Sequence, residues 1–125
     1  MSSVAETTPA AGRILVVDDD ASQRGLLGAF LSRHGFQLAM AASAEEGLAL
    51  LEAEPFAMMI SDVRMPGMTG LEALRRLRDK RPALPVLLVT AYADIRDAVA
   101  AMRDGAVNDL EKPIDLDELL ASVRR

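Results

Sequence analysis

The residues of this chain that can do chemistry stand at the ends of short, β-branched apolar runs. Three acids follow the first such run, and a further acid, a hydroxyl and an ammonium group close three later ones: Asp18, Asp19, Asp20, Asp62, Thr90 and Lys112. Clustered carboxylates are the oxygen ligands that a hard divalent cation such as magnesium prefers. An ionised aspartate can also attack phosphorus and form an acyl phosphate, and a lysine and a hydroxyl can hold phosphoryl oxygens. The pattern therefore indicates a site for a divalent cation and a phosphoryl group.

Five predicted strands alternate with five predicted helices, and this alternation brings the reactive residues to one place. The strands are predicted at residues 13–18, 37–41, 56–61, 86–90 and 107–112. Short apolar strands that alternate with helical patterns are typical of an α/β fold, in which crossover helices join parallel strands. Ligands of such sheets bind outside the carboxyl ends of the strands. We therefore expect the acids, the hydroxyl and the lysine to converge at that edge.

Capping signals mark the ends of the predicted helices. Four residues precede helical patterns and carry the side-chain oxygen that a cap requires: Ser43, Thr69, Asp94 and Asp115. Glutamates three residues after Ser43 and Thr69 complete the pattern of a capping box. Gly35 and Gly105 suit the left-handed position that ends a helix. For Asp20, a helix cap and a place in the acidic site remain equally open.

The composition fits one globular domain. The chain has 125 residues, half of them apolar, and a net charge of −5, which argues against direct nucleic-acid contact by this domain. We assign residues 13–125 to the domain and residues 1–12 to a flexible tail that lacks the features of a signal peptide. No apolar run approaches the ~20 residues of a membrane helix, so no membrane contact is expected. The absence of cysteine fits a cytoplasmic protein.

Two groups of charged residues are interpreted as structural. The third predicted helix carries a basic run that we interpret as a solvated face and not as a nucleic-acid patch: Arg75, Arg76, Arg78, Lys80 and Arg81. His34 is the one histidine of the chain, and its place at a helix end is typical of a surface group that suits the helix dipole.

Four motifs, in this order and at this spacing, resemble the receiver domain of two-component response regulators (the CheY-like superfamily). The motifs are ILVVDD (residues 14–19), SDVRMPGMTG (61–70), VLLVTA (86–91) and EKP (111–113). The likeness covers residues 13–125. It implies a doubly wound, flavodoxin-like fold with a five-stranded parallel sheet in the order 2-1-3-4-5 and five helices.

The resemblance implies a phosphorylation site and a magnesium site. Asp62 matches the phosphoacceptor of the family. The carboxylates of Asp18, Asp19 and Asp62 match its Mg²⁺ ligands, and the backbone carbonyl of Arg64 matches a further one. The family also implies a sensor histidine kinase as phosphodonor, so that His34 needs no role. Such a domain is not an enzyme in the ordinary sense, because it accelerates only its own phosphorylation and dephosphorylation.

The resemblance also implies a conformational switch, and one position departs from the family pattern. Thr90 matches the switch hydroxyl, and Lys112, which precedes a proline that is cis in the family, matches the phosphate-binding lysine. Three residues before the lysine the family usually has Tyr or Phe, whereas this chain has Asp109. We expect Asp109 to lie on the same solvated edge as Glu111. An aspartate cannot fill an apolar pocket without a desolvation cost, so we expect a weaker readout than the aromatic residue gives.

The family supplies expectations about partners and output. The signalling face is expected at the fourth helix, fifth strand and fifth helix, where the chain can form a homodimer or contact an output domain. Residues 92–119 resemble receivers that precede ATPase transcription activators, which favours an output in transcription.

Two other classes of function compete with this interpretation. The acids of residues 18–20 loosely match the Asp-x-Asp nucleophile of haloacid-dehalogenase-type phosphatases, which would leave Asp62 without a role. A receiver fold kept only for phosphorylation-independent binding is the second alternative. Asp109 mildly favours it, whereas the complete acidic site argues against it.

Overall fold

The computed structural model describes residues 12–90, 99–100, 102–106 and 108–124. The strands of this part are β1 (Ile14–Val17), β2 (Leu38–Ala41), β3 (Met58–Asp62), β4 (Val86–Thr90) and β5 (Asn108–Glu111). Its helices are α2 (Ala21–Arg33), α3 (Ala44–Ala53), α4 (Gly70–Lys80) and α6 (Leu116–Arg124). None of the helices in the described ranges is long and apolar enough to span a membrane.

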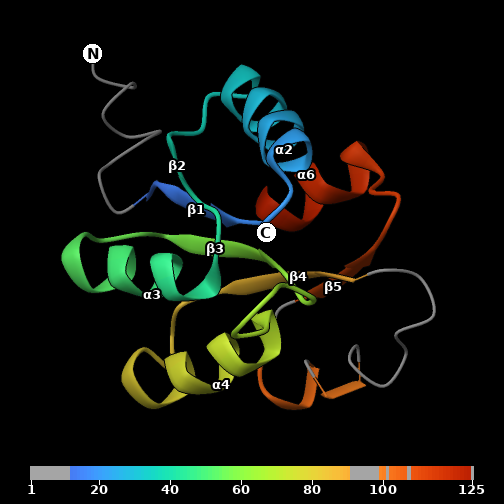
Figure 1. Ribbon diagram of the computed structural model, residues 1–125. Helices are drawn as coiled ribbons and strands as arrows, with labels where there is room; N and C mark the ends of the chain where they lie inside the picture. Colours follow the sequence, from blue (N-terminus) through green and yellow to red (C-terminus); the bar gives the residue numbers. More distant parts are fainter. Residues whose placement is uncertain (1–11, 91–98, 101, 107, 125) are drawn as a thin grey trace.

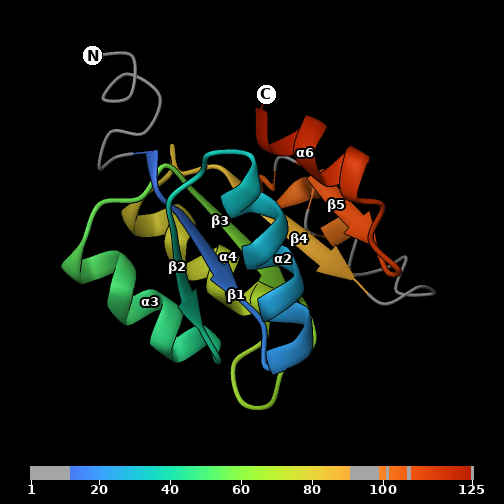
Figure 2. The same cartoon turned by 90° about the horizontal axis from the view of Figure 1, so that it is seen from above.

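The five strands form one parallel sheet in the order β2-β1-β3-β4-β5 (Figures 1 and 2). This order confirms the predicted doubly wound, flavodoxin-like fold. The first strand, β1, lies between β2 and β3, and the later strands extend the sheet from β3, which leaves β2 and β5 as the edge strands. The carboxyl ends of β1 and β3 therefore lie next to each other at the point where the chain changes direction across the sheet, the usual place for a ligand in this fold class.

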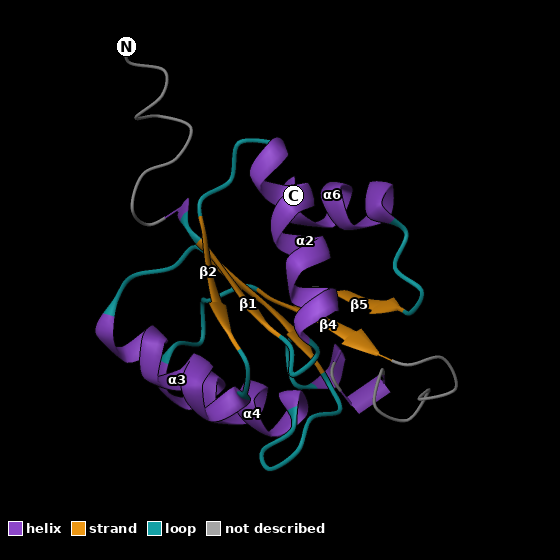
Figure 3. Ribbon diagram, turned by 45° about the horizontal axis from the view of Figure 1, so that its top comes forward, coloured by secondary structure: helices purple, strands orange, loops and turns teal. Residues whose placement is uncertain are grey.

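Two apolar layers hold the helices on the sheet. Helices α2 and α6 cover one face, and α3 and α4 cover the other (Figure 3). Alternation along β1 explains the division: Ile14 and Val16 pack with Leu27 and Leu31 of α2, whereas Leu15 packs into the opposite cluster. All residues of β1, β3 and β4 are buried, as expected of central strands that are covered on both faces.

The predicted element ends are correct to within about two residues. Strand β4 has its predicted bounds, and the other strands begin or end one or two residues away. Thr69 forms the predicted capping box with Glu72, and Asp115 accepts bonds from two backbone amides of the last helix. The predicted helix from Asp94 to Gly105 lies partly outside the described residues; residues 99–100 and 102–103 are helical. Of the predicted tail, residues 1–11 lie outside them too.

The interpretation of the basic run as a solvated face agrees with the exposure of Arg75, Arg76 and Lys80, but not with the position of Arg78, which is half-buried. Arg78 donates hydrogen bonds to the backbone carbonyls of Arg81, Pro82, Leu84 and Gly105. Arg75 pairs with Asp104, and Lys80 pairs with Glu52 of α3. The bonds to Asp104 and Gly105 connect α4 with the turn that precedes β5, and the pair with Glu52 connects it with α3.

The near end of α4 packs directly on the backbone of the predicted phosphoacceptor. A Cβ atom added at Gly70 would lie 2.1 Å from the carbonyl oxygen of Asp62, too close for any side chain. The amide of Gly70 also donates to the carbonyl of Val63 at 2.8 Å. A glycine here is therefore what allows the first turn of α4 to press against the end of β3.

Gly70→Ala is expected to destabilise the fold by about 1–3 kcal/mol, the usual cost of overpacking, because the added methyl group meets backbone and not a flexible side chain. Gly25→Ala in α2 is the matched control. Apart from the neighbouring residues and backbone of its own helix, no described atom lies within 4 Å of its added Cβ, and alanine favours a helix interior over glycine by up to about 1 kcal/mol. Urea unfolding of the two variants checks this. Equal stability of Gly70→Ala and the original chain would contradict the close contact.

Candidate functional site

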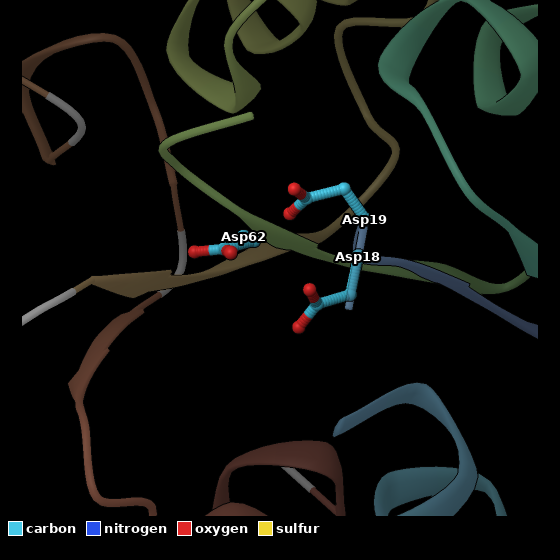
Figure 4. A group of neighbouring side chains, drawn as sticks. All are labelled: Asp18, Asp19 and Asp62. Carbon is cyan, nitrogen blue, oxygen red and sulfur yellow. The ribbon is translucent and has the colours of Figure 1, made fainter. Parts of the chain in front are cut away.

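The register of the sheet brings the predicted acids together. Val17 of β1 is paired with Ser61 of β3, so the next residues on the two strands, Asp18 and Asp62, end at the same level. Together with Asp19 they form a cluster in which one carboxylate oxygen of each lies within 4.8 Å of the others (Figure 4). Asp18 and Asp62 are buried, whereas Asp19 is exposed. The cluster is thus open to solvent on one side.

The backbone around Asp18 fixes the position of its carboxylate. The amide of Asp20 donates to Oδ1 of Asp18 at 2.9 Å, and the amide of Asp18 donates to the carbonyl of Ala41 at 3.1 Å. A guanidinium N–H of Arg24 donates to the carbonyl of Asp18 at 2.6 Å. Arg24 stands within α2 with no motif around it, so the sequence held no sign of this contact.

The structure resolves the open alternatives for Asp20. Its carboxylate accepts hydrogen bonds from the amides of Ser22 and Gln23, so Asp20 is the N-cap of α2. Its side chain does not take part in the cluster of three carboxylates. The run of three acids therefore divides into a pair at the site and a helix cap.

Burial raises the pKa of Asp18 above the usual 3.8. The hydrogen bond from the Asp20 amide acts in the opposite direction, as does the positive charge of Lys112, whereas the charges of Asp62 and Asp19 raise the pKa further. The folded chain therefore retains a proton on Asp18 at pH values where the unfolded chain has released it. Stability falls as pH rises from 3.8 through the raised pKa, and the loss is complete above that raised pKa.

Asp18→Asn is expected to stabilise the chain at neutral pH in the absence of metal. The variant removes the buried charge but keeps the Oδ1 acceptor of the Asp20 amide. We expect the melting temperature to rise by roughly 3–6 °C, which corresponds to about 1 kcal/mol. Melting curves from pH 3 to pH 8 with a chelator present check this, and the advantage should vanish at the acidic end. A variant that melts below the original chain at neutral pH would contradict the direction of the shift.

Lys112 and Thr90 join the acids at the same edge. The ammonium of Lys112 donates to Oδ2 of Asp62 at 3.1 Å, and the backbone amide of Lys112 donates to the carbonyl of Thr90 at 2.8 Å. Thr90 ends β4 and is buried. The peptide bond between Lys112 and Pro113 is cis, as the family resemblance implies. The lysine and the threonine therefore come from the ends of β5 and β4, which lie on the side of β3 away from β1.

The position of Asp109 corrects one expectation. Glu111 is exposed, but Asp109 is half-buried and its Oδ1 accepts a hydrogen bond from the hydroxyl of Thr90 at 3.1 Å. Thr90 and Asp109 come from the neighbouring strands β4 and β5. Asp109 is paired with Leu88, two residues before Thr90, so it lies diagonally opposite Thr90 on the same face of the sheet. Strand alternation alone showed the face of the sheet, but not this partner.

Glu45 of α3 holds the loop that follows Asp62. Its Oε2 accepts a hydrogen bond from the amide of Met68 at 3.2 Å, beside Gly67, whose φ of 77° requires a left-handed conformation. The loop also contains Arg64, whose backbone carbonyl we predicted as a metal ligand. Sequence reasoning missed Glu45 because its place in a helical first turn is explained equally well by the helix dipole.

The donor set of the cluster suits magnesium. Three carboxylates supply hard oxygen ligands, and the exposure of Asp19 leaves room for the waters that magnesium usually keeps. Zinc, by contrast, favours sulfur and imidazole ligands. Two of the carboxylates are buried side by side, so a bound cation would relieve their mutual repulsion.

Comparison with known proteins agrees with this geometry. The family described as the response regulator receiver domain matches residues 14–124. The chain is 40% identical over 114 residues to the DNA-binding transcriptional regulator NtrC of Salmonella typhimurium, which covers 91% of this chain and 24% of NtrC. It is also 40% identical over 112 residues to the transcriptional regulatory protein FixJ of Bradyrhizobium diazoefficiens, covering 90% of this chain and 55% of FixJ.

A solved structure gives the same result. The response regulator receiver protein from Pseudomonas putida superposes with a TM-score of 0.86 at 36% identity, covering 90% of this chain and 95% of that one. The chain spans about a quarter of the length of NtrC and about half of the length of FixJ. The chain therefore belongs to the response regulator receiver domain family of two-component signalling proteins.

Proposed function

We propose that this domain is a phosphorylation-dependent switch in which Asp62 accepts a phosphoryl group from a sensor histidine kinase. The observation that carries the proposal is the convergence of the three carboxylates with Lys112, whose ammonium lies 3.1 Å from Oδ2 of Asp62. A carboxylate so placed is oriented by its partner, and the site is open to solvent on the side of Asp19. It can serve as a nucleophile toward phosphorus.

The transfer exchanges one bond to phosphorus for another. An oxygen of Asp62 forms the new P–O bond, while the P–N bond to the donor histidine breaks and the imidazole leaves with its electron pair. The product is an acyl phosphate on Asp62. Such displacements depend mainly on positioning and on neutralising negative charge. Lys112 and Thr90 donate to the phosphoryl oxygens in this scheme. The backbone amide of Asp20 holds the carboxylate of Asp18 in place.

We infer that Asp18, Asp19, Asp62 and the backbone carbonyl of Arg64 hold a magnesium ion. When bound, the ion supplies positive charge next to the phosphoryl oxygens and the clustered carboxylates. The residues of the chain provide the rest: Lys112 offers a second positive charge, and the packing of Gly70 against Asp62 fixes the backbone of the nucleophile.

The output that we propose is control of transcription. NtrC and FixJ carry names that describe transcriptional regulators, and each is longer than the part that this chain matches. In our proposal the phosphorylated domain acts through the face that contains β5 and α6, either on an output domain or on a second copy of itself. The domain itself makes no direct contact with nucleic acid in this scheme, and it works in the cytoplasm.

Incubation with acetyl phosphate tests the proposal without the cognate kinase. Intact-mass measurement should show one added phosphoryl group when magnesium is present, and no addition when a chelator is in excess. Labelling of equal extent in chelator would contradict a magnesium-dependent site. No labelling under either condition would favour the alternative, a receiver fold that binds partners without phosphorylation.

A further inference from the structure

The hydroxyl of Thr90 already has an acceptor in this structure. Thr90 is only 4% exposed, and its Oγ1 lies 3.1 Å from Oδ1 of Asp109 on the neighbouring strand. In this bond the threonine hydroxyl is the donor and the carboxyl oxygen is the acceptor. The single proton of the threonine side chain is therefore committed to Asp109.

That commitment conflicts with binding of a phosphoryl group. Phosphoryl oxygens, like carboxylate oxygens, accept hydrogen bonds from a neutral hydroxyl, and a hydroxyl has one proton to donate. Thr90 can thus bond to Asp109 or to a phosphoryl group on Asp62, but not to both through that proton. A hydrogen bond to a charged group is among the stronger ones in proteins, so the choice between acceptors has a measurable free-energy difference.

We propose that Asp109 is a positioning residue that holds the Thr90 hydroxyl in the unphosphorylated domain and competes with the phosphoryl group for it. This inference rests on the proposed function of Asp62. Each phosphorylation event must break the bond between β4 and β5, and the bond in turn weakens the hold on the phosphoryl group. By linkage the two effects are equal in size: phosphorylation weakens the bond by the same factor by which the bond weakens the hold on the phosphoryl group.

The arrangement gives the site a readout that needs no aromatic ring. Breaking the bond releases the side chain of Asp109 from β4, at the edge strand of the sheet. The signal is then a change in the hydrogen bonding of the Asp109 side chain, which lies on β5. The coupling is limited by the strength of one hydrogen bond, since a ligand shifts two states only by its differential affinity for them.

A double-mutant cycle tests the competition. The four proteins are the original chain, Thr90→Val, Asp109→Leu and the double variant, and the probe is beryllofluoride with magnesium, a mimic of the phosphoryl group. Loss of the Asp109 charge changes affinity equally with and without the threonine hydroxyl, so the cycle cancels it. We expect Asp109→Leu to tighten binding about fivefold more in the original chain than in the Thr90→Val variant, the effect of ~1 kcal/mol for one hydrogen bond. Equal factors in the two backgrounds would overturn the proposal.

Two additions separate positioning from a general structural effect. Thr90→Ser keeps the hydroxyl and should restore the coupling, whereas a purely structural role of the threonine methyl group would leave it lost. Asp109→Ala follows the same scheme if the leucine variant does not fold, because it also removes the acceptor.

Unfolding in urea without phosphate or its mimic tests the bond by itself. The effect of Asp109→Leu on the unfolding constant should differ by roughly fivefold between the original chain and the Thr90→Val variant. The reason is that the bond exists only when both side chains are present. If this coupling is present but beryllofluoride binds to none of the proteins, the proposed function fails and the competition fails with it. If beryllofluoride binds but both cycles are additive, the proposed function stands and the competition between acceptors is refuted.

Discussion

Asp62→Asn is expected to take up no phosphoryl group from acetyl phosphate, under conditions in which the original chain takes up one. The amide has nearly the shape of the carboxylate and keeps an oxygen acceptor for Lys112, so the fold should be retained. It lacks the negative charge and the nucleophilic oxygen that attack phosphorus. Intact-mass measurement after incubation with magnesium checks the result, and a melting curve confirms that the variant is folded.

Asp20→Asn is the matched control for this substitution. Asp20 is also an acidic residue that follows β1, but it caps α2. Asparagine caps helices as well as aspartate does. The control should be labelled to the same extent as the original chain. Labelling of Asp62→Asn would show that a different residue is the nucleophile.

Lys112→Met is expected to slow phosphorylation by acetyl phosphate by about 10²–10³-fold, the usual effect of removing one preorganised charge donor from a reacting oxyanion. Methionine keeps much of the length of the side chain but removes the ammonium that lies 3.1 Å from Asp62. The variant should also lose about 1–3 kcal/mol of stability, because Asp62 is 6% exposed and would keep a charge without this partner.

Lys80→Met is the control for the loss of a lysine. Lys80 pairs with Glu52 at 3.0 Å, but the side chains are 72% and 66% exposed, so the pair contributes little to stability. We expect its phosphorylation rate and melting temperature to match those of the original chain. If Lys112→Met is phosphorylated as fast as Lys80→Met, the ammonium has no part in the transfer.

The predictable part of the fold and site follows from local signals. Apolar runs marked the strands, and caps such as Thr69 and Asp115 marked where helices begin. Because parallel strands end at one edge, the sequence also predicted that Asp18 and Asp62 would meet. The resemblance to a known family added the strand order and the cis peptide bond before Pro113.

The unpredicted part depends on contacts between residues far apart in the chain. Asp109 looked like a solvated residue of an edge strand, but register places it within reach of Thr90, nineteen positions away. Glu45 looked like a first-turn residue of a helix, but the loop after Asp62 folds back onto it. Arg78 looked solvated, but it binds carbonyls of two separate loops. Each of these partners is chosen by tertiary packing, which periodicity along the chain does not contain.

Mapping the phosphorylated residue tests the proposed mechanism most directly. An acyl phosphate is reduced by borohydride to an alcohol, which converts the modified aspartate to homoserine and marks it for peptide mass spectrometry. We predict homoserine at position 62 alone after treatment with acetyl phosphate and magnesium. Homoserine at position 18 or 19 would contradict the mechanism, because it would make the first strand the source of the nucleophile, as in the phosphatase alternative.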